Sequence, residues 1–151
     1  MKKLLLLLLT IILLFTMTAC SGYNRIMREH LSSEDNYYAV DASFCSYEKT
    51  NDRIYLYVSV DDKSVFDSSE ANSEEIRLVL VGENCTALSE VFEKEKIHEG
   101  DRIAVKCSTW IYMDSTFYYV AELKTQNQTL LSFDDGLKNI IKYMNDNKSL
   151  F

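Results

Sequence analysis

The sequence predicts a mainly β domain of five strands, with a short helix between the third and fourth strands and an amphipathic helix after the fifth. Apolar and polar residues alternate along five separate segments, which is the pattern of strands with one buried face. In two further segments the apolar residues recur every three to four positions, as they do along the buried face of a helix. We therefore expect a single domain over residues 37–151.

The five expected strands differ in how clearly they alternate. The second is the clearest, because Ile54 and Leu56 share one face with other aliphatic residues while polar and aromatic residues occupy the other. The third carries apolar residues on both faces, which predicts that both faces are covered. In the fifth, Leu123 is expected on the face opposite to Tyr118. The strands are expected over residues 38–47, 53–60, 75–81, 102–110 and 117–124.

The two expected helices have recognisable starts. Thr86 is expected to cap the first, and Ser132 with Asp135 has the spacing of a capping box before the second. We expect the second helix to pack on the strands; the alternative is a helix that binds a partner and leaves an apolar patch exposed. The expected buried stripes are Leu88, Val91 and Phe92 in the first helix and Leu137, Ile140, Ile141 and Met144 in the second.

Residues 1–19 have the features of a secretory signal peptide. Two lysines precede an apolar run from Leu4 to Phe15, and small residues then lead to Cys20. An uncleaved membrane anchor is the alternative, since residues 4–19 are only slightly fewer than the roughly 17 to 25 that span a bilayer. Both interpretations put the remaining domain outside the cytoplasm.

The end of this segment, Thr18-Ala19-Cys20, resembles the lipobox of bacterial lipoproteins, with Met17 where leucine is usual. The resemblance implies cleavage before Cys20 and a diacylglyceryl group on its sulfur. The domain would then be anchored to the cell membrane on its extracytoplasmic face. Each methylene buried in the bilayer contributes roughly 0.8 kcal/mol to membrane binding. Two acyl chains therefore anchor a protein stably, whereas a protein with one chain would dissociate from the membrane and rebind.

Residues 20–36 are expected to be the lipidated cysteine followed by a solvated spacer. The apolar residues Ile26, Met27 and Leu31 are scattered among charged and polar ones, which is typical of a segment that does not fold by itself. His30 is therefore expected to be a solvated residue of this spacer.

The charge of the chain argues against a nucleic-acid partner. The chain has 16 basic and 23 acidic residues, and removal of the two lysines of the signal segment leaves 14 against 23, a net charge of −9. Nucleic-acid affinity depends chiefly on lysine and arginine at the phosphates. An acidic domain is also repelled by an anionic membrane surface, which leaves the lipid on Cys20 to anchor it.

The order of three strands, a helix and two strands resembles the OB-fold, and more narrowly the small bacterial lipoproteins whose mature part is an OB-like (tRNA_anti-like) domain. The resemblance covers roughly residues 38–124 and implies a five-stranded barrel; a barrel of another topology is the alternative. OB-folds commonly bend their first strand at a glycine or a bulge, and residues 38–47 contain no glycine. The local motif, just before the fourth strand, is Ile97-x-x-Gly100-Asp101-x-Ile103-x-Val105.

The OB resemblance implies a ligand surface on the outer face of the second and third strands. Arg53, Tyr55, Tyr57 and Arg77 have the strand parity for that face, and aromatic rings with a few cations suit a glycan, a peptide or an acidic protein. We therefore expect a binding module of the cell envelope whose ligand the sequence does not identify. The alternatives are that the two tyrosines only cover the barrel, or that this face stacks single-stranded nucleic acid, which the net charge disfavours.

No residue pattern resembles a catalytic motif, and we expect no enzyme activity, metal or cofactor. The two histidines, His30 and His98, fall in the spacer and in an exposed turn, and there is no nucleophile elbow or phosphate-binding glycine loop. An envelope enzyme with an unrecognised active site is the alternative. The acidic segment 61–74 lacks the ligand spacing and central glycine of a calcium loop, so we expect a solvated loop.

The three cysteines after Cys20 are Cys45, Cys85 and Cys107, and outside the cytoplasm they could include one disulfide. Cys45 and Cys107 fall in the first and fourth strands, which are neighbours in an OB-fold. Their alternation puts them on opposite faces, which prevents a bond between them unless a bulge intervenes. We expect reduced, mostly buried thiols, and their spacing is not that of metal ligands.

Overall fold

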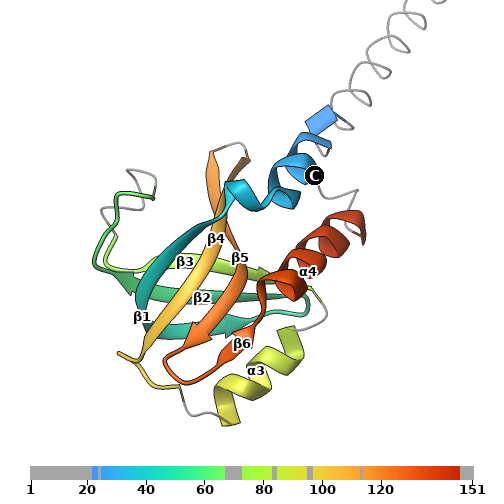
Figure 1. Cartoon of the computed structure of the whole chain (residues 1–151). Helices are drawn as coiled ribbons and strands as arrows, with labels where there is room; N and C mark the ends of the chain where they lie inside the picture. Colours follow the sequence, from blue (N-terminus) through green and yellow to red (C-terminus); the bar gives the residue numbers. More distant parts are fainter. Residues whose placement is uncertain are drawn as a thin grey trace, which may run out of the picture.

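Figure 1 shows the protein as a computed structural model, which describes residues 22–23, 25–66, 73–82, 85–94, 97–112 and 114–146. The signal segment 1–19, Cys20 and part of the acidic loop lie outside the described residues. The expectations for those residues therefore stay predictions.

The described residues form a six-stranded sheet, in which five strands close into a ring. The strands are β1 (Tyr38–Lys49), β2 (Arg53–Val60), β3 (Ile76–Val81), β4 (Arg102–Tyr112), β5 (Ser115–Thr125) and β6 (Thr129–Leu131). Neighbours in the order β3-β2-β1-β4-β5-β6 pair antiparallel, and a short parallel pairing of β3 with β5 closes the ring. The mainly β class is confirmed, but the strand count differs from five. β6 was missed because three residues are too few to show alternation.

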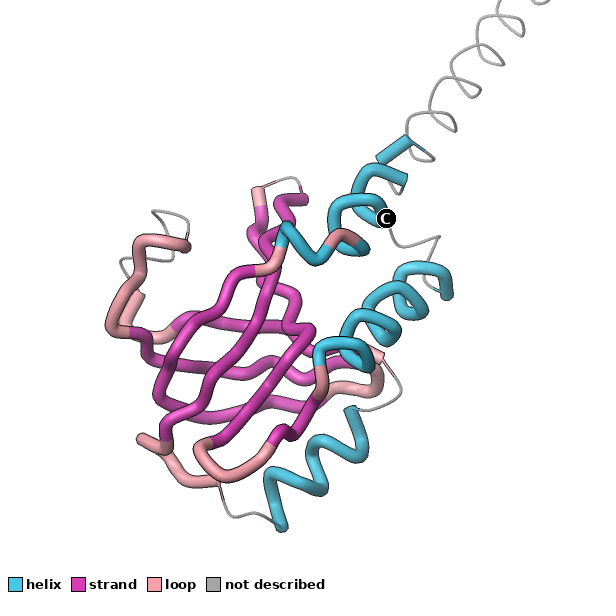
Figure 2. Tube along the Cα trace, viewed as in Figure 1, coloured by secondary structure: helices cyan, strands magenta, loops and turns pink. Residues whose placement is uncertain are grey.

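Helices cover the ring along one outer side and at one end (Figures 1 and 2). The expected helix between the third and fourth strands is α3 (Cys85–Lys94), which contacts β2 and β6 and begins one residue before the expected cap, Thr86. The expected final helix is α4 (Phe133–Asp146), which packs on β5 and β3. A further helix covers residues 25–32 and leads into the short 3-10 helix η1 (Glu34–Asn36).

Ser132 and Asp135, the residues of the predicted capping box, lie at the start of α4 and form the half of the box in which Ser132 caps the backbone. Ser132 Oγ accepts a hydrogen bond from the backbone N–H of Asp135 at 3.3 Å and donates one to Asp135 Oδ2 at 2.6 Å. The hydrogen bond from Ser132 lowers the pKa of the Asp135 carboxyl. Since α4 packs on the strands, the expectation that its apolar stripe is buried is also confirmed, with Ile140 and Met144 among its buried residues.

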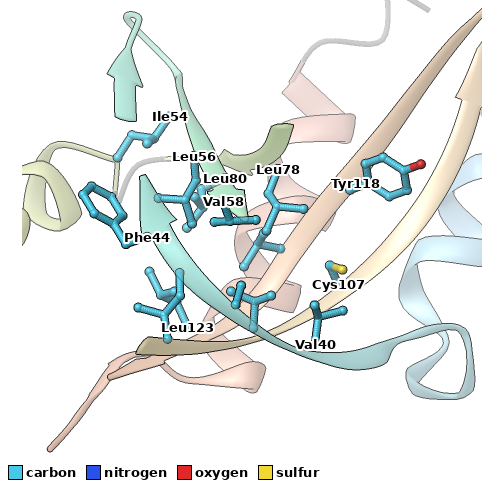
Figure 3. Close-up of a cluster of buried hydrophobic side chains, with 14 of the residues drawn as sticks. Val40, Phe44, Ile54, Leu56, Val58, Leu78, Leu80, Cys107, Tyr118 and Leu123 are labelled. Carbon is cyan, nitrogen blue, oxygen red and sulfur yellow. The ribbon is translucent and has the colours of Figure 1, made fainter. Parts of the chain in front are cut away.

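Two apolar clusters lie on the two sides of β3 and β5. The larger cluster fills the inside of the ring with side chains from all six strands and from α3 (Figure 3). The smaller cluster lies between the outer face of β3 and β5, the helix α4 and residues 27 and 31. We call the larger one the inner cluster and the smaller one the outer cluster. Val79 and Val81 belong to the smaller cluster, so the prediction that the third strand is covered on both faces is confirmed.

Two β-bulges change which residues face the inside of the ring. In β1 the register skips Cys45, so this strand bends at a bulge and needs no glycine. In β5 the register skips Ala121, which leaves Ala121 in the outer cluster and turns Leu123 into the inner one with Tyr118. The expectation that Leu123 lies opposite to Tyr118 is therefore wrong, because strict alternation holds only up to the bulge.

The expectation of a solvated spacer does not hold for residues 25–36. Met27 and Leu31 are buried in the outer cluster, and Leu31 is 0% exposed. The hydroxyl of Tyr37 donates a hydrogen bond to the Leu31 carbonyl oxygen at 2.7 Å, which ties the end of the helix to the start of β1. Composition alone hid this packing, since the two buried residues are the only large apolar side chains that the helix contributes to the domain interior.

The Leu31→Ala variant tests whether this helix belongs to the folded domain. Removal of a fully buried leucine side chain is expected to lower the free energy of unfolding by about 2–5 kcal/mol. Urea unfolding of the purified protein measures this change. Ile26→Ala is the matched control in the same helix, because Ile26 is 55% exposed, and we expect a change within about 0.5 kcal/mol. Equal stability of the two variants would show that the segment is a spacer.

The Gly136→Ala variant tests the contact between α4 and the bulge at Ala121. A Cβ at residue 136 would lie 1.9 Å from the carbonyl oxygen of Ala121, a backbone atom that cannot rotate away. At a solvent-exposed position in the middle of a helix, replacement of glycine by alanine stabilises the fold by about 0.5–1 kcal/mol. Here we expect a loss of about 1–3 kcal/mol, measured by urea unfolding with the exposed Lys138→Ala as control. A stabilised Gly136→Ala variant would contradict the close approach.

Candidate functional site

The structure brings the four predicted site residues onto one outer face of β2 and β3. In the antiparallel pairing of these strands, Tyr57 lies opposite Arg77, Tyr55 opposite Val79 and Arg53 opposite Val81. On the other side of β2, Tyr55 lies opposite Glu48 of β1. We refer to Arg53, Tyr55, Tyr57 and Arg77 as the β2–β3 outer face.

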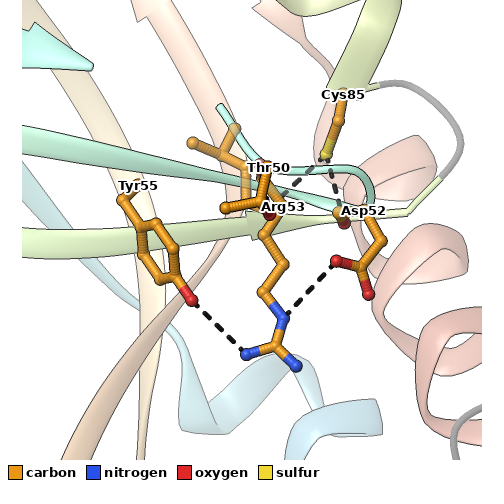
Figure 4. A network of polar contacts seen from close by, with 6 residues as sticks. Thr50, Asp52, Arg53, Tyr55 and Cys85 are labelled. Atoms are coloured by element: carbon orange, nitrogen blue, oxygen red, sulfur yellow. Dashed lines mark hydrogen bonds and ion pairs between the residues drawn. The ribbon is translucent and has the colours of Figure 1, made fainter. Parts of the chain in front are cut away.

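Half of this face is tied to α4 and to the turn before β2. The guanidinium of Arg53 lies 5.3 Å from the ring centre of Tyr143 in α4, and its Nε lies 3.9 Å from Asp52 Oδ1. One terminal nitrogen of Arg53 donates a hydrogen bond to the Tyr55 hydroxyl at 3.5 Å (Figure 4). Only 27% of the Arg53 side chain is exposed, and Tyr55 packs against the outer cluster. Arg53 and Tyr55 therefore help to hold the helix.

The other half of the face is open to solvent. Arg77 is exposed, and its guanidinium lies 5.4 Å from the ring centre of Tyr55, within the range of a cation–π contact. Tyr57 is half-buried and its hydroxyl donates a hydrogen bond to Glu48 Oε2 at 3.4 Å. Two aromatic rings thus lie beside one cation and one carboxylate, an arrangement that can stack against a flat apolar group and hydrogen-bond to polar groups around it.

The histidines lie in different surroundings. The expectation that His30 is solvated is wrong: its Nε2–H donates to the Thr109 carbonyl oxygen at 3.1 Å, and Ser108 Oγ lies 3.2 Å from the same nitrogen. His98 is exposed in a turn, as expected, where its backbone N–H donates to Asp101 Oδ2 at 2.8 Å. Ser108, whose hydroxyl lies beside the His30 ring, is 0% exposed.

The acidic loop after β2 keeps exposed carboxylates in its described part. Asp61 forms an ion pair with Arg102, whose guanidinium nitrogen lies 3.2 Å from Asp61 Oδ2. Asp62 caps the turn, because its Oδ1 accepts a hydrogen bond from the Ser64 backbone N–H at 2.9 Å. Within the described ranges, no three histidine, cysteine, aspartate or glutamate side chains come together as metal ligands would. Arg102 lines two shallow cavities, of about 420 and 340 Å³, whose walls are largely polar.

The three cysteines are free and lie apart from one another. Cys107 is buried opposite Tyr38 in the β1–β4 pairing, whereas Cys45 lies seven residues further along β1. Seven residues of strand span about 23 Å, so these two thiols are too distant for a bond regardless of which face they occupy. Cys85 is buried near the start of α3, where its thiol donates to the carbonyl oxygens of Asp52 and Leu80 at 3.6 Å (Figure 4).

Comparison with protein-family models finds no match, and comparison with curated proteins finds none either. Among the residues that the structure describes, no helix has the length and apolar character needed to cross a membrane. The site is therefore interpreted from its own geometry.

Thiol alkylation tests the burial of the three cysteines. Burial raises the pKa of Cys85 from 9.0 to about 11 and that of Cys107 to about 12. Burial also raises the pKa of Cys45, but its side chain is only half-buried. Two pKa units lower the thiolate fraction about 100-fold relative to an ordinary thiol, and packing also blocks access to Cys85 and Cys107, so in mildly alkaline buffer we expect iodoacetamide to modify Cys45 first. Peptide mass spectrometry locates the modified residue. Denaturant should make the three thiols react alike, and modification of native Cys107 as fast as Cys45 would contradict the structure.

Proposed function

We propose that the chain is a lipid-anchored, extracytoplasmic binding module of the bacterial cell envelope. Support for the anchor comes from the sequence, in which two lysines, an apolar run and Thr18-Ala19 precede Cys20. The observation that carries the binding role is the open part of the β2–β3 outer face, where Tyr57 lies opposite the exposed Arg77.

We further propose that the domain is an OB-like barrel. The closed ring of β1, β2, β3, β5 and β4 supports this, as does the position of α3 between β3 and β4. The bulge at Cys45 supplies the bend in the first strand for which the sequence has no glycine. OB-folds bind ligands across the second and third strands, which are the strands that carry Tyr57 and Arg77 here.

The chemistry of the open face favours a glycan, a peptide or a protein segment as ligand. A tyrosine ring can pack against a sugar ring or an apolar side chain, while Arg77 and Glu48 can pair with groups of either charge. Polyphosphate is a poor match, because the net charge without the signal lysines is −9. We therefore assign no nucleic-acid role to this face.

Crosslinking of intact cells followed by pull-down tests the binding role. The native protein is compared with a Tyr57→Ala, Arg77→Ala double variant, and Arg102→Ala serves as the control that removes an exposed arginine elsewhere. We expect a protein or glycan fragment that is lost in the double variant and retained in the control. Tyr55 is left intact because it packs against the outer cluster and its replacement would also weaken the fold.

The anchor is tested in the same samples by intact mass. We expect a chain that begins at Cys20 with a mass increase from diacylglyceryl and acyl groups, and a Cys20→Ser variant that stays unprocessed. A chain with an unmodified Cys20 would contradict lipidation, and equal recovery of every crosslinked species from native and double-variant protein would contradict the role of the β2–β3 outer face.

A further inference from the structure

The helix over residues 25–32 and the preceding Tyr23 are clamped to the tip of the β4–β5 hairpin (Figures 1 and 2). The Tyr23 ring lies 5.3 Å from Trp110 and 5.2 Å from Tyr112, measured between ring centres. The Tyr23 hydroxyl donates to the Ile111 carbonyl oxygen at 3.1 Å and accepts a hydrogen bond from the Trp110 indole N–H. The first described residues of the chain are thus fixed to the hairpin.

This end of the molecule also carries exposed aliphatic side chains. Of the described residues, the exposed large apolar side chains are Ile26, Ile111 and Val65, at 55%, 58% and 43% exposed. Ile26 lies on the helix and Ile111 near the end of β4, whereas Val65 lies in the loop after β2 and lines a cavity with Arg102 at the start of β4. We call the set Tyr23, Ile26, Trp110, Ile111 and Tyr112 the apolar end.

The chain that would hold the lipid leads directly to the apolar end. Two residues, Ser21 and Gly22, lie between Cys20 and Tyr23, and the three residue steps from Cys20 to Tyr23 reach at most about 10 Å when extended. A flexible spacer over the sixteen residues from 21 to 36 would instead have held the domain at a typical distance of about 22 Å. The interfacial layer of a bilayer is roughly 5–8 Å thick on each side, so the apolar end lies within its reach.

We propose that the apolar end rests in the interfacial layer of the lipid bilayer to which Cys20 is anchored; this rests on the proposed lipidation. Tryptophan and tyrosine rings gather at this depth in membrane proteins because one side of each is apolar and the other can hydrogen-bond. Ile26 and Ile111 bury aliphatic surface there, and the free energy of that burial does not depend on charge. It therefore acts against the repulsion between the acidic domain and anionic lipids. The domain is then held in one orientation by the lipid and by this second contact.

Trp110 is the single tryptophan of the chain and reports on this contact. The full chain, purified from cell membranes in detergent, is reconstituted into phosphatidylcholine vesicles with either ordinary or brominated acyl chains. Bromine quenches tryptophan fluorescence only at close range, so we expect the emission to fall in the brominated vesicles. We also expect aqueous acrylamide to quench Trp110 less in the vesicle-bound chain than in the same chain without vesicles.

Variants identify the side chains responsible. The Ile26→Glu, Ile111→Glu double variant should lose the quenching by brominated lipid. Val65→Glu, which places one such charge at an exposed apolar residue elsewhere, should keep it. Because all three positions are exposed, each variant should retain the native thermal midpoint. Equal quenching in the double variant and the native chain would overturn the proposal.

The outcomes separate this proposal from the one on which it rests. Vesicles that fail to retain the native chain on sedimentation would contradict the anchor, and the docking with it. Retention of the chain with unquenched Trp110 would overturn only the docking, and would leave a lipid-tethered module whose apolar end faces water or another protein.

Discussion

The burial of β3 and β5 on both faces is the constraint on which the rest of the structure depends. Tyr118 and Val120 lie inside the ring, and their neighbours Tyr119 and Ala121 are as deeply buried on its outer side. A ring that left this outer side in water would forgo roughly 1.5–3 kcal/mol for each large apolar side chain. The ring therefore requires a cover, which α4 and the helix over residues 25–32 provide together.

The cover explains how the β2–β3 outer face is divided. α4 comes so close to β5 that Gly136 lies against the bulged Ala121, where no side chain fits. This close packing brings the ring centre of Tyr143 to 5.3 Å from the guanidinium of Arg53, and the contact helps to hold α4 on the sheet. Tyr57 and Arg77 lie beyond the edge of the cover, so the same packing that immobilises one half of the face leaves the other half open for a ligand.

Alternation predicted the strands because each has one face inside the ring. The apolar stripes predicted α3 and α4 because each helix buries one side against an apolar cluster. The bulges at Cys45 and Ala121 could not be predicted, since neither residue has a backbone preference that marks a bulge. The helix over residues 25–32 was missed because a stripe of two buried residues is too short to show a period. Strand parity put the four site residues on one face, but their unequal exposure depends on α4, a contact with residues far along the chain.

The packed N-terminal helix also limits what an anchored domain could meet. A domain of about 115 residues is roughly 35 Å across, and the three residue steps from Cys20 to Tyr23 add at most about 10 Å. The β2–β3 outer face of such a protein could reach only partners within roughly 45 Å of the membrane. A domain on a short tether reaches fewer partners than one on a long flexible linker. It is also confined to a smaller volume, which raises its effective concentration near partners at the same surface. For a domain anchored as proposed, a ligand on or close to the membrane therefore fits better than one deep in the cell wall.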